Sequence, residues 1–318
     1  MRAVGVTQFG GPEALEVVEL PEPSAGPGQI KVAVHAAAVN PTDTMTRNGA
    51  RAQALSKDPP PYVPGMDVAG VVEEIGEGAA EVAPDLSVGD HVMAIVLPDG
   101  AHGGYASKLA LPAGSVVRVP DGVDDATAAT LPMNALTARL ALDRLDLRPG
   151  ATVAVTGAAG AFGGYLIQLA KVDGLRVVAD SSEADEELVR SLGADVVVRR
   201  GEGVADRIRE VVAEGVDGLA DGAVQNDAVI PAVRDGGGIA TVRGYAGPQD
   251  GSDRGINWYP VMVWDYGENR PALDRLREQV EKGEVTLRLA GSLPAEQAPE
   301  AHRRLEAGGV RGRQVLTF

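Results

Sequence analysis

Cysteine is absent from this chain of 318 residues. Without thiols the protein forms no disulfide, has no thiolate nucleophile, and binds neither zinc nor an iron–sulfur cluster through cysteine. Long apolar runs are absent too, since none approaches the ~18 residues that span a membrane. No hydrophobic signal core follows the first residues. We therefore expect a cytoplasmic protein without a membrane partner.

Positive charge is scarce, because 29 Lys and Arg face 45 Asp and Glu and give a formal net charge of −16 at pH 7. This charge repels phosphodiester backbones, so we expect no nucleic-acid partner. Hydrophobic residues make up 44% of the chain and charged residues 23%. Such a composition can fill an apolar core, and the length suits two domains.

The most informative stretch runs from Val153 to Lys171. It opens with alternating β-branched residues, which predict a buried strand. Gly157, Gly160 and Gly163 then form a turn, and apolar residues at helical spacing follow. Glycines let phosphates approach the backbone, and the helix N-terminus attracts them. The stretch predicts a pyrophosphate cradle, although such a turn can also serve only to pack a helix on a strand.

A second predicted strand, at 175–179, ends in the polar run 180–182, where a ribose-reading residue belongs. A carboxylate here accepts from the ribose 2′-hydroxyl and selects NAD. Asp180, however, falls one residue before the reading position, and alternation along a strand turns it away. Ser181 then takes that position.

The residues around Ser181 favour NADP(H) over NAD(H). Ser181 and Ser182 can donate to a 2′-phosphate, and Arg199 or Arg200 at the end of the next predicted strand can pair with it. The two arginines equally fit a solvated turn, so the cofactor preference is a hypothesis.

The sequence pattern changes at about residue 120, from short apolar runs separated by Gly and Pro to alternating helical and strand patterns. Before it, the patterns predict strands at 3–6, 15–20, 30–38, 68–75 and 91–96. After it, helical and strand patterns alternate, which indicates a parallel sheet with right-handed crossovers. The later predicted strands are 153–156, 175–179, 195–198, 218–224, 236–242, 260–266, 286–290 and 314–318. The predicted helices are 121–147 with a break at Pro132, 184–192, 203–213, 228–234, 271–282 and 298–307.

A short capped helix is predicted after Asn40. Asn40 suits the N-cap, Pro41 the first helical position, and Gly49 the end. Asp43 is expected to pair with Arg47 at i,i+4. Because a cap residue faces the space beside the helix start, Asn40 keeps a functional interpretation.

Three further residues have both a structural and a functional interpretation. Asp67 stands in an apolar segment and is either a satisfied buried acid or a site residue. His102 is a possible proton donor or a solvated loop residue. Trp264 shapes a substrate pocket or covers a dimer edge.

Taken together, these motifs resemble the medium-chain dehydrogenase/reductase superfamily, in particular its zinc-free quinone oxidoreductase branch. The resemblance covers nearly the whole chain, and its motifs are 39–43, 64–70 with 88–92, 158–163 with Gln168 and Lys171, 192–195, and 301–308 with 312–313. It implies an α/β fold with a GroES-like β-barrel catalytic domain, residues 1–121 and 259–318. It also implies a Rossmann domain with a doubly wound parallel sheet, residues 122–258, and a homodimer.

The resemblance also implies the chemistry and its residues. Asn40 stands where the zinc-dependent relatives begin a cysteine motif, so no zinc is expected. Asn40 and Thr137 would border the nicotinamide and act in catalysis. The expected pyrophosphate contacts are Gly157, Ala159, Gly160, Phe162 and Gly163, and the expected nicotinamide pocket consists of Val224, Arg243, Gly244 and Tyr245.

The expected activity is zinc-independent hydride transfer from NADPH to a quinone-like small molecule. Two alternatives stay open: an NADPH-dependent enoyl or 2-alkenal C=C reductase, and a non-catalytic nucleotide-binding or redox-sensing protein. The chain departs from its branch at Met45 and Arg51, where some quinone reductases carry tyrosines, and at Ala161, which replaces a usual glycine.

Overall fold

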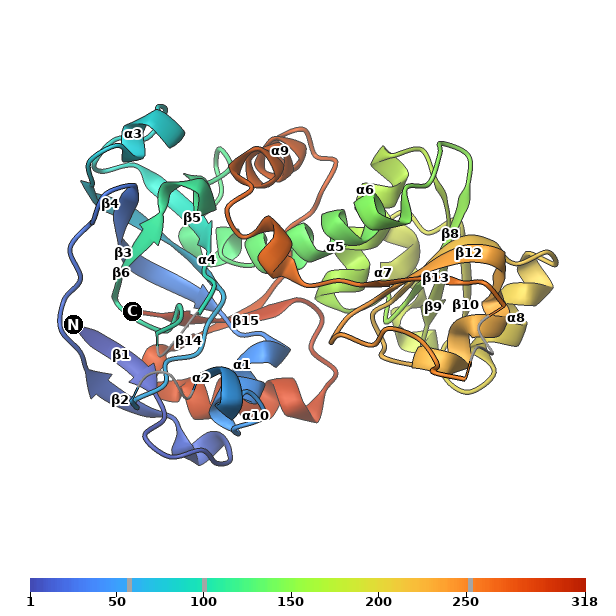
Figure 1. The fold of residues 1–318 in the computed structure, drawn as a ribbon, viewed down its shortest axis with the longest axis horizontal. Coiled ribbons are helices and arrows are strands. Elements are labelled where there is room, and N and C mark those ends of the chain that lie inside the picture. Colours follow the sequence, from blue (N-terminus) through green and yellow to red (C-terminus); the bar gives the residue numbers. More distant parts are fainter. Residues whose placement is uncertain (56–58, 99–101, 251–253) are drawn as a thin grey trace. The chain divides into compact units, whose positions relative to one another are not determined.

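The chain folds into two units that alternate along the sequence. The structure is a computed structural model that describes residues 1–55, 59–98, 102–250 and 254–318 (Figure 1). Unit 1 consists of Met1–Met133, Trp264–Lys282 and Leu287–Phe318, and unit 2 of Asn134–Val263 and Gly283–Thr286. The domain boundaries expected at 121/122 and 258/259 stay a prediction.

Unit 1 is built on a sheet with the strand order β14-β15-β3-β4-β5-β7, in which β6 also pairs with β3. Its longest strand, β3, buries Ile30, Val32 and Val34 and turns the residues between them outward. The strands are β1 (Arg2–Gly5), β2 (Glu16–Glu19), β3 (Gln29–Ala38), β4 (Asp67–Ile75), β5 (His91–Ile95), β6 (Lys108–Pro112), β7 (Val116–Arg118), β14 (Leu289–Pro294) and β15 (Arg313–Thr317).

The end of the chain completes the first sheet. Strand β15 pairs antiparallel with β3, and Leu316 belongs to the same apolar core as Ile30. The last strands therefore return to the N-terminal sheet, as the resemblance implies.

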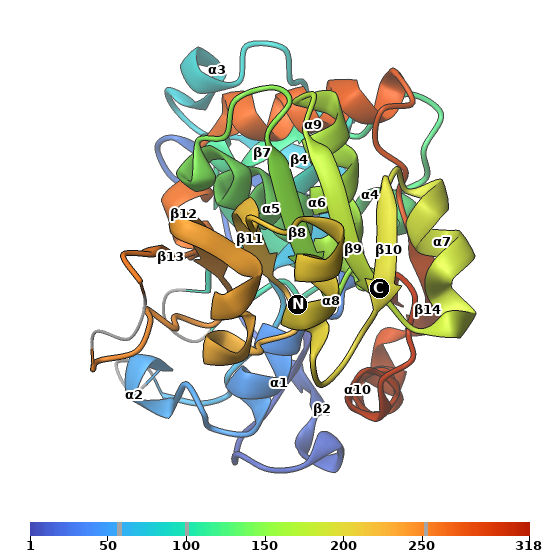
Figure 2. The same cartoon turned by 90° about the vertical axis from the view of Figure 1, so that its right-hand side faces the viewer.

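Unit 2 is a parallel sheet in the order β10-β9-β8-β11-β12-β13. Numbered along the chain, this is the 3-2-1-4-5-6 order of a dinucleotide-binding fold. Figure 2 shows β10, β9 and β8 as neighbouring strands. The strands are β8 (Thr152–Thr156), β9 (Arg176–Ser181), β10 (Val196–Arg199), β11 (Val216–Asp221), β12 (Val233–Thr241) and β13 (Asn257–Pro260). The predicted α/β class is confirmed.

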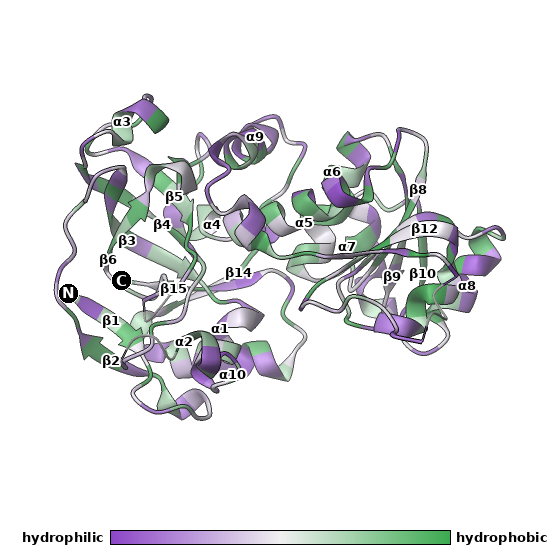
Figure 3. Ribbon diagram, viewed as in Figure 1, coloured by the Kyte–Doolittle hydropathy of each residue, from purple (hydrophilic) through white to green (hydrophobic). Residues whose placement is uncertain are grey.

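Helices α8 and α9 each bury an apolar side, with Val204 and Ile208 on α8 and Leu273 and Leu276 on α9. Figure 3 shows α9 largely hydrophilic, whereas β5 is largely hydrophobic. The α-helices are α1 (Pro41–Arg47), α2 (Ala52–Leu55), α3 (Ala79–Val82), α4 (Asp125–Ala128), α5 (Pro132–Leu145), α6 (Ala161–Val172), α7 (Glu186–Ser191), α8 (Val204–Val211), α9 (Arg270–Glu281) and α10 (Ala298–Ala307). The 3₁₀ helices are η1 (Pro12–Ala14), η2 (Ala113–Ser115), η3 (Glu183–Asp185), η4 (Asn226–Ala232), η5 (Val263–Tyr266) and η6 (Ala295–Gln297). Among the described residues, no helix has the length and apolar character needed to cross a bilayer.

Two predicted strands lie elsewhere, and both lie at a sheet edge in the structure. The strand expected at 260–266 ends at Pro260, and Val263 is buried in a 3₁₀ turn rather than in a ladder. The strand expected at 286–290 runs instead over Leu289–Pro294. Both strands contain proline, which is tolerated at a sheet edge. Proline also argues against a strand when only the sequence is considered, so these strands are hard to locate from the sequence. The helix predicted at 228–234 is the 3₁₀ helix η4, with Pro231 inside it.

Candidate functional site

The predicted phosphate cradle forms between β8 and α6. Gly157 has φ +67°, a backbone conformation that favours glycine. A Cβ on Gly163 would lie 2.5 Å from the Gly157 carbonyl oxygen, so this helix packs on its turn only with glycine. At Gly160, the N-cap of α6, a Cβ would meet only that same oxygen, at 3.1 Å. The space beyond Gly160 therefore suits an anion at a helix N-terminus.

A buried carboxylate closes one side of this turn. Asp180, at the end of β9, accepts a hydrogen bond from the Ala158 N–H at 3.1 Å and another from the Gly157 N–H. Burial raises the pKa of Asp180, and these hydrogen bonds oppose the rise. The carboxylate is thus engaged by the glycine turn itself.

The serines after Asp180 are tied locally. Ser181 is buried and donates its hydroxyl to the Ser182 carbonyl oxygen at 2.7 Å, and Ser182 donates to Asp185. The Arg200 N–H donates to the Ser181 carbonyl oxygen at 2.9 Å, which places Arg200 beside the serines.

The carboxyl ends of β11 and β12 carry strained backbone. Val224 has φ +57° and Arg243 has φ +66°, in the left-handed region that non-glycine residues rarely adopt. Such strain gathers at ligand sites, and ligands of this sheet type bind at the carboxyl ends of the strands. The Tyr245 hydroxyl donates to Asp227, and the Thr241 hydroxyl donates to the Tyr245 carbonyl oxygen.

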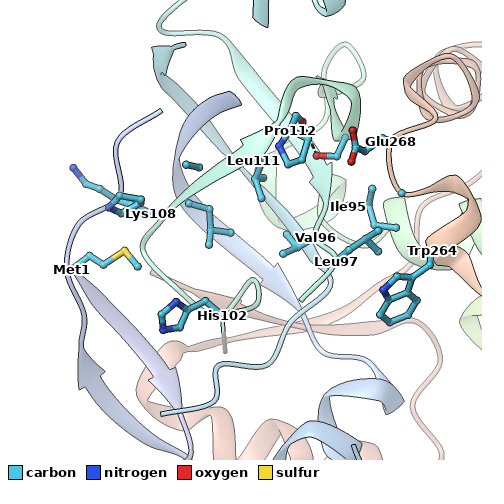
Figure 4. A pocket seen from close by; sticks show the side chains of 15 residues that line it. Met1, Ile95, Val96, Leu97, His102, Lys108, Leu111, Pro112, Trp264 and Glu268 are labelled. Carbon is cyan, nitrogen blue, oxygen red and sulfur yellow. Dashed lines mark hydrogen bonds between the residues drawn. The ribbon is translucent and has the colours of Figure 1, made fainter. Parts of the chain in front are cut away.

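In unit 1, an apolar pocket of about 480 Å³ opens beside β5. Figure 4 shows Leu97 and Trp264 at one end and His102 at the other. The Arg51 guanidinium lies 5.1 Å from the centre of the Trp264 ring, a cation–π contact. The volume and lining suit a small, largely apolar molecule.

Two family descriptions match the chain. "Alcohol dehydrogenase GroES-like domain" matches residues 26–121, and "Zinc-binding dehydrogenase" matches residues 192–316. The chain is 31% identical to a quinone oxidoreductase of Rattus norvegicus over 99% of this chain and 97% of that protein. It belongs to the quinone oxidoreductase branch of the medium-chain dehydrogenase/reductase superfamily. The predicted GroES-like and Rossmann architecture is confirmed.

Other proteins resemble this chain over most of their own length. An NADPH-dependent alkenal/one oxidoreductase of Arabidopsis thaliana is 29% identical over 99% of this chain and 79% of that protein. The quinone oxidoreductase structure from Coxiella burnetii has a TM-score of 0.84 and 27% identity, and covers 100% of this chain and 99% of its own. A mycobacterial protein complexed with NADPH has a TM-score of 0.86 and 29% identity, with 100% coverage of both chains.

Asn40 is fully buried. Its side-chain amide donates to Asp67 Oδ2 at 2.6 Å, and its backbone N–H donates to Asp43 Oδ2 at 2.7 Å. Asp67 also accepts from the Met133 N–H. Thr137 is buried on α5, in unit 2. Their contact with the nicotinamide stays a prediction.

The expected ion pair between Asp43 and Arg47 is wrong. Asp43 instead accepts from the Gly65 N–H at 3.1 Å and the Tyr105 hydroxyl at 2.9 Å. Arg47 reaches Glu306 on α10 at 2.6 Å. The reason is that Asp43 faces buried donors, whereas an i,i+4 pair needs a shared helix surface.

Burial shifts the titration of this network. It raises the pKa of Asp43 to about 6 and that of Asp67 to about 7. Burial, with the positive charge of Arg47, lowers the pKa of His302 to about 3. Tyr105 links Asp43 to His302, since its hydroxyl donates to Asp43 and lies 3.1 Å from His302 Nε2. Asp67 is thus buried and hydrogen-bonded to Asn40 and Met133, and its role as a site residue stays a hypothesis.

Sequence reasoning missed Asp221, the buried acid at the end of β11. It accepts from the Thr156 hydroxyl at 2.6 Å and from the Asn226 N–H at 2.8 Å, which ties the glycine turn to the next strand. The sequence did contain a signal for this residue, since Asp221 is a carboxylate at the end of the apolar strand β11. The phosphate and nicotinamide contacts predicted for this part of the chain stay predictions.

Proposed function

We propose that this protein is an NADPH-dependent reductase that delivers a hydride to a quinone or to a C=C bond conjugated with a carbonyl. The observation that carries the proposal is the full-length similarity to a quinone oxidoreductase, 31% over 99% of the chain. In this proposal the glycine turn would bind the cofactor, and the apolar pocket would take the acceptor. Nicotinamide supplies the hydride, and the protein supplies orientation and exclusion of water.

The proposed cofactor contacts follow the edge of the parallel sheet. Gly157, Ala159, Gly160, Phe162 and Gly163 lie in the cradle or the first turn of α6 and would hold the pyrophosphate. Val224, Arg243, Gly244 and Tyr245 follow β11 and β12 and would line the nicotinamide pocket. Asn40 and Thr137 would border the reacting end.

NADP(H) is proposed over NAD(H) because the backbone of Arg200 lies beside the predicted ribose site, from which its guanidinium would reach a 2′-phosphate. Arg200 is held next to Ser181 by its backbone hydrogen bond. Asp180 is already engaged by the glycine turn. Ser181, Ser182 and Arg200 are therefore the proposed 2′-phosphate contacts.

The acceptor is proposed to bind in the apolar pocket of unit 1. Leu97 and Trp264 line one end of this pocket, and His102 borders the other. The chain has no cysteine to hold zinc as a Lewis acid. The proposed acceptor is therefore one that takes a hydride without metal assistance.

The test is the initial rate of NADPH and NADH oxidation with a benzoquinone, a fused-ring ortho-quinone, a 2-alkenal and a simple ketone. We expect turnover of a quinone or the alkenal, faster with NADPH and insensitive to a chelator. Faster turnover of the alkenal than of the quinones would favour the C=C reductase. Chelator-sensitive reduction of the ketone would contradict the proposal. NADPH binding without turnover of any acceptor would favour the non-catalytic alternative.

A variant links this activity to the cradle. Gly160→Val adds a side chain where a Cβ meets only one backbone oxygen, so it should fold and obstruct the phosphate. We expect KM for NADPH to rise at least about tenfold, or roughly 1.4 kcal/mol. Ala213→Val, at an exposed position of unit 2, is the control and should leave KM unchanged. An unchanged KM in Gly160→Val would exclude the cradle as the cofactor site.

A further inference from the structure

Two histidines and an aspartate converge on the surface of unit 1, away from the residues assigned above. His35 Nδ1 lies 2.7 Å from Asp125 Oδ2, and His91 Nδ1 lies 2.9 Å from Asp125 Oδ1 and 3.1 Å from Oδ2. One ligand atom from each of the three residues lies within 4.8 Å of the other two. The two imidazoles therefore share a single carboxylate.

The fold of unit 1 brings these residues together from three elements. His35 lies on β3 and His91 on β5, the two strands that flank β4. The register between β3 and β4 shifts between Val34 and Ala36, so His35 sits at a bulge. Bulges re-aim a side chain, and here the bulge accompanies its approach to Asp125. Asp125 opens α4, which contacts β3, β4 and β5.

The cluster is open to solvent on the histidine side. The side chains of His35 and His91 are 48% and 56% exposed, whereas Asp125 is 12% exposed. Within the described part of the chain, the ion pairs of Asp125 run to these two histidines. The carboxylate is thus held in place while the imidazoles stay accessible to an ion from solution.

We propose that His35, His91 and Asp125 form a binding site for a divalent transition metal such as Zn²⁺. Imidazole nitrogen and carboxylate oxygen are zinc ligands, and three protein ligands with water in the fourth position make a complete shell. The sequence predicts no zinc because cysteine is absent. The proposed ligands are two histidines and an aspartate, so this site needs no cysteine. The site is independent of the proposed reductase chemistry.

The contacts to Asp125 need only a small adjustment to hold the ion, and the ligand atoms of all three residues already lie within 4.8 Å of one another. Tetrahedral zinc with ligand bonds of about 2.0–2.2 Å separates its ligand atoms by about 3.3 Å. The contacts to Asp125 span 2.7 to 3.1 Å, so each would open by a few tenths of an ångström. The exposed imidazoles can make this movement, and the ion would replace the hydrogen bonds that now link the three residues.

Bound metal would join three elements of unit 1. It would tie β3 and β5 to α4, which ends a few residues before α5. Binding to the folded protein alone stabilises it by mass action. A zinc-dependent rise in the unfolding temperature of the wild type is therefore expected.

The test is isothermal titration of the full-length, chelator-treated and dialysed protein with zinc sulfate. We expect one saturable Zn²⁺ per chain. His91→Ala and Asp125→Asn should each weaken binding at least about tenfold, the lower range seen when only an outer-shell partner is lost. His102→Ala removes an exposed histidine outside the cluster and is the matched control, expected to bind zinc like the wild type.

Thermal unfolding gives a second readout that does not depend on enzyme activity. Zinc should raise the unfolding temperature of the wild type and of His102→Ala, but not of His91→Ala. Absence of saturable binding would overturn the proposal. So would equal affinity in wild type, His91→Ala and Asp125→Asn, because the zinc would then bind elsewhere. Neither measurement uses turnover, so this proposal and the reductase proposal fail separately.

Discussion

At the scale of the residue, Arg200 bears most directly on the choice between the two nicotinamide cofactors. Its backbone N–H binds the carbonyl oxygen of Ser181, while the neighbouring Arg199 pairs with Glu183 at 3.5 Å on the surface. Two adjacent arginines thus offer one candidate for a 2′-phosphate and one matched control.

Arg200→Ala should raise KM for NADPH by about 10- to 100-fold, because a hydrogen bond to a charged group contributes about 1.5–3 kcal/mol. KM for NADH should change little, because NADH has no 2′-phosphate. Initial rates with both cofactors measure the difference. Arg199→Ala should leave both values near wild type. Equal losses with NADPH and NADH in Arg200→Ala would mean that this arginine does not read the phosphate.

At the scale of the element, the long side chain of Arg47 joins helix α1 directly to α10. Arg47 is buried and donates to Glu306 at 2.6 Å and to the Gly10 carbonyl oxygen at 3.2 Å, and it lies 3.3 Å from His302 Nδ1. The contact to Glu306 joins residues 259 positions apart in the chain.

Arg47→Met keeps most of the side-chain volume and removes these contacts. It should lower the free energy of unfolding by about 2 kcal/mol, less than for a fully buried pair because Glu306 is 40% exposed. Arg304→Met on α10 removes an exposed i,i+4 pair with Glu300 and should cost less than about 0.5 kcal/mol. Urea denaturation measures both. Equal losses in the two variants would show that Arg47 contributes only as a surface charge.

At the scale of the whole molecule, buried acids make the stability of the protein depend on pH. The pKa values of Asp43 and Asp67 rise from 3.8 to about 6 and about 7 in the folded protein, chiefly through burial. Between pH 3.8 and about pH 7, these two carboxyl groups bind more protons in the folded chain than in the unfolded chain. Their contribution to stability therefore falls as pH rises. His302 acts in the opposite sense, because its pKa falls from 6.5 to about 3 and stability rises with pH in that window.

Asp67→Asn should flatten the fall in stability between about pH 4 and pH 7. An amide stays neutral throughout, so up to about 3 kcal/mol of the decline should disappear, at 1.4 kcal/mol per pH unit. Denaturation at several pH values gives the slope, which is independent of any constant loss from the altered hydrogen bonds. Glu81→Gln, which removes an exposed carboxylate on α3, should keep the wild-type slope. An unchanged slope in Asp67→Asn would contradict the assignment.

What the sequence determined by itself is local. The glycine turn, the strand before it and the helix after it follow from residues within about twenty positions, where backbone conformation and helical spacing decide the structure. The alternation of strands and helices likewise predicted the parallel sheet of unit 2. Edge strands with proline were misplaced because their pairing depends on a neighbour and not on their own pattern.

Only the tertiary structure decided which distant side chains meet. His35 and Asp125 are 90 positions apart, and no periodicity links them. Asp43 bonds to buried donors and not to Arg47, because burial makes an unpaired donor more costly than a lost surface ion pair. The network of Asp43, Asp67 and His302 and the cluster at Asp125 exist because strand order and helix packing place them together, after local chemistry has fixed the elements that carry them.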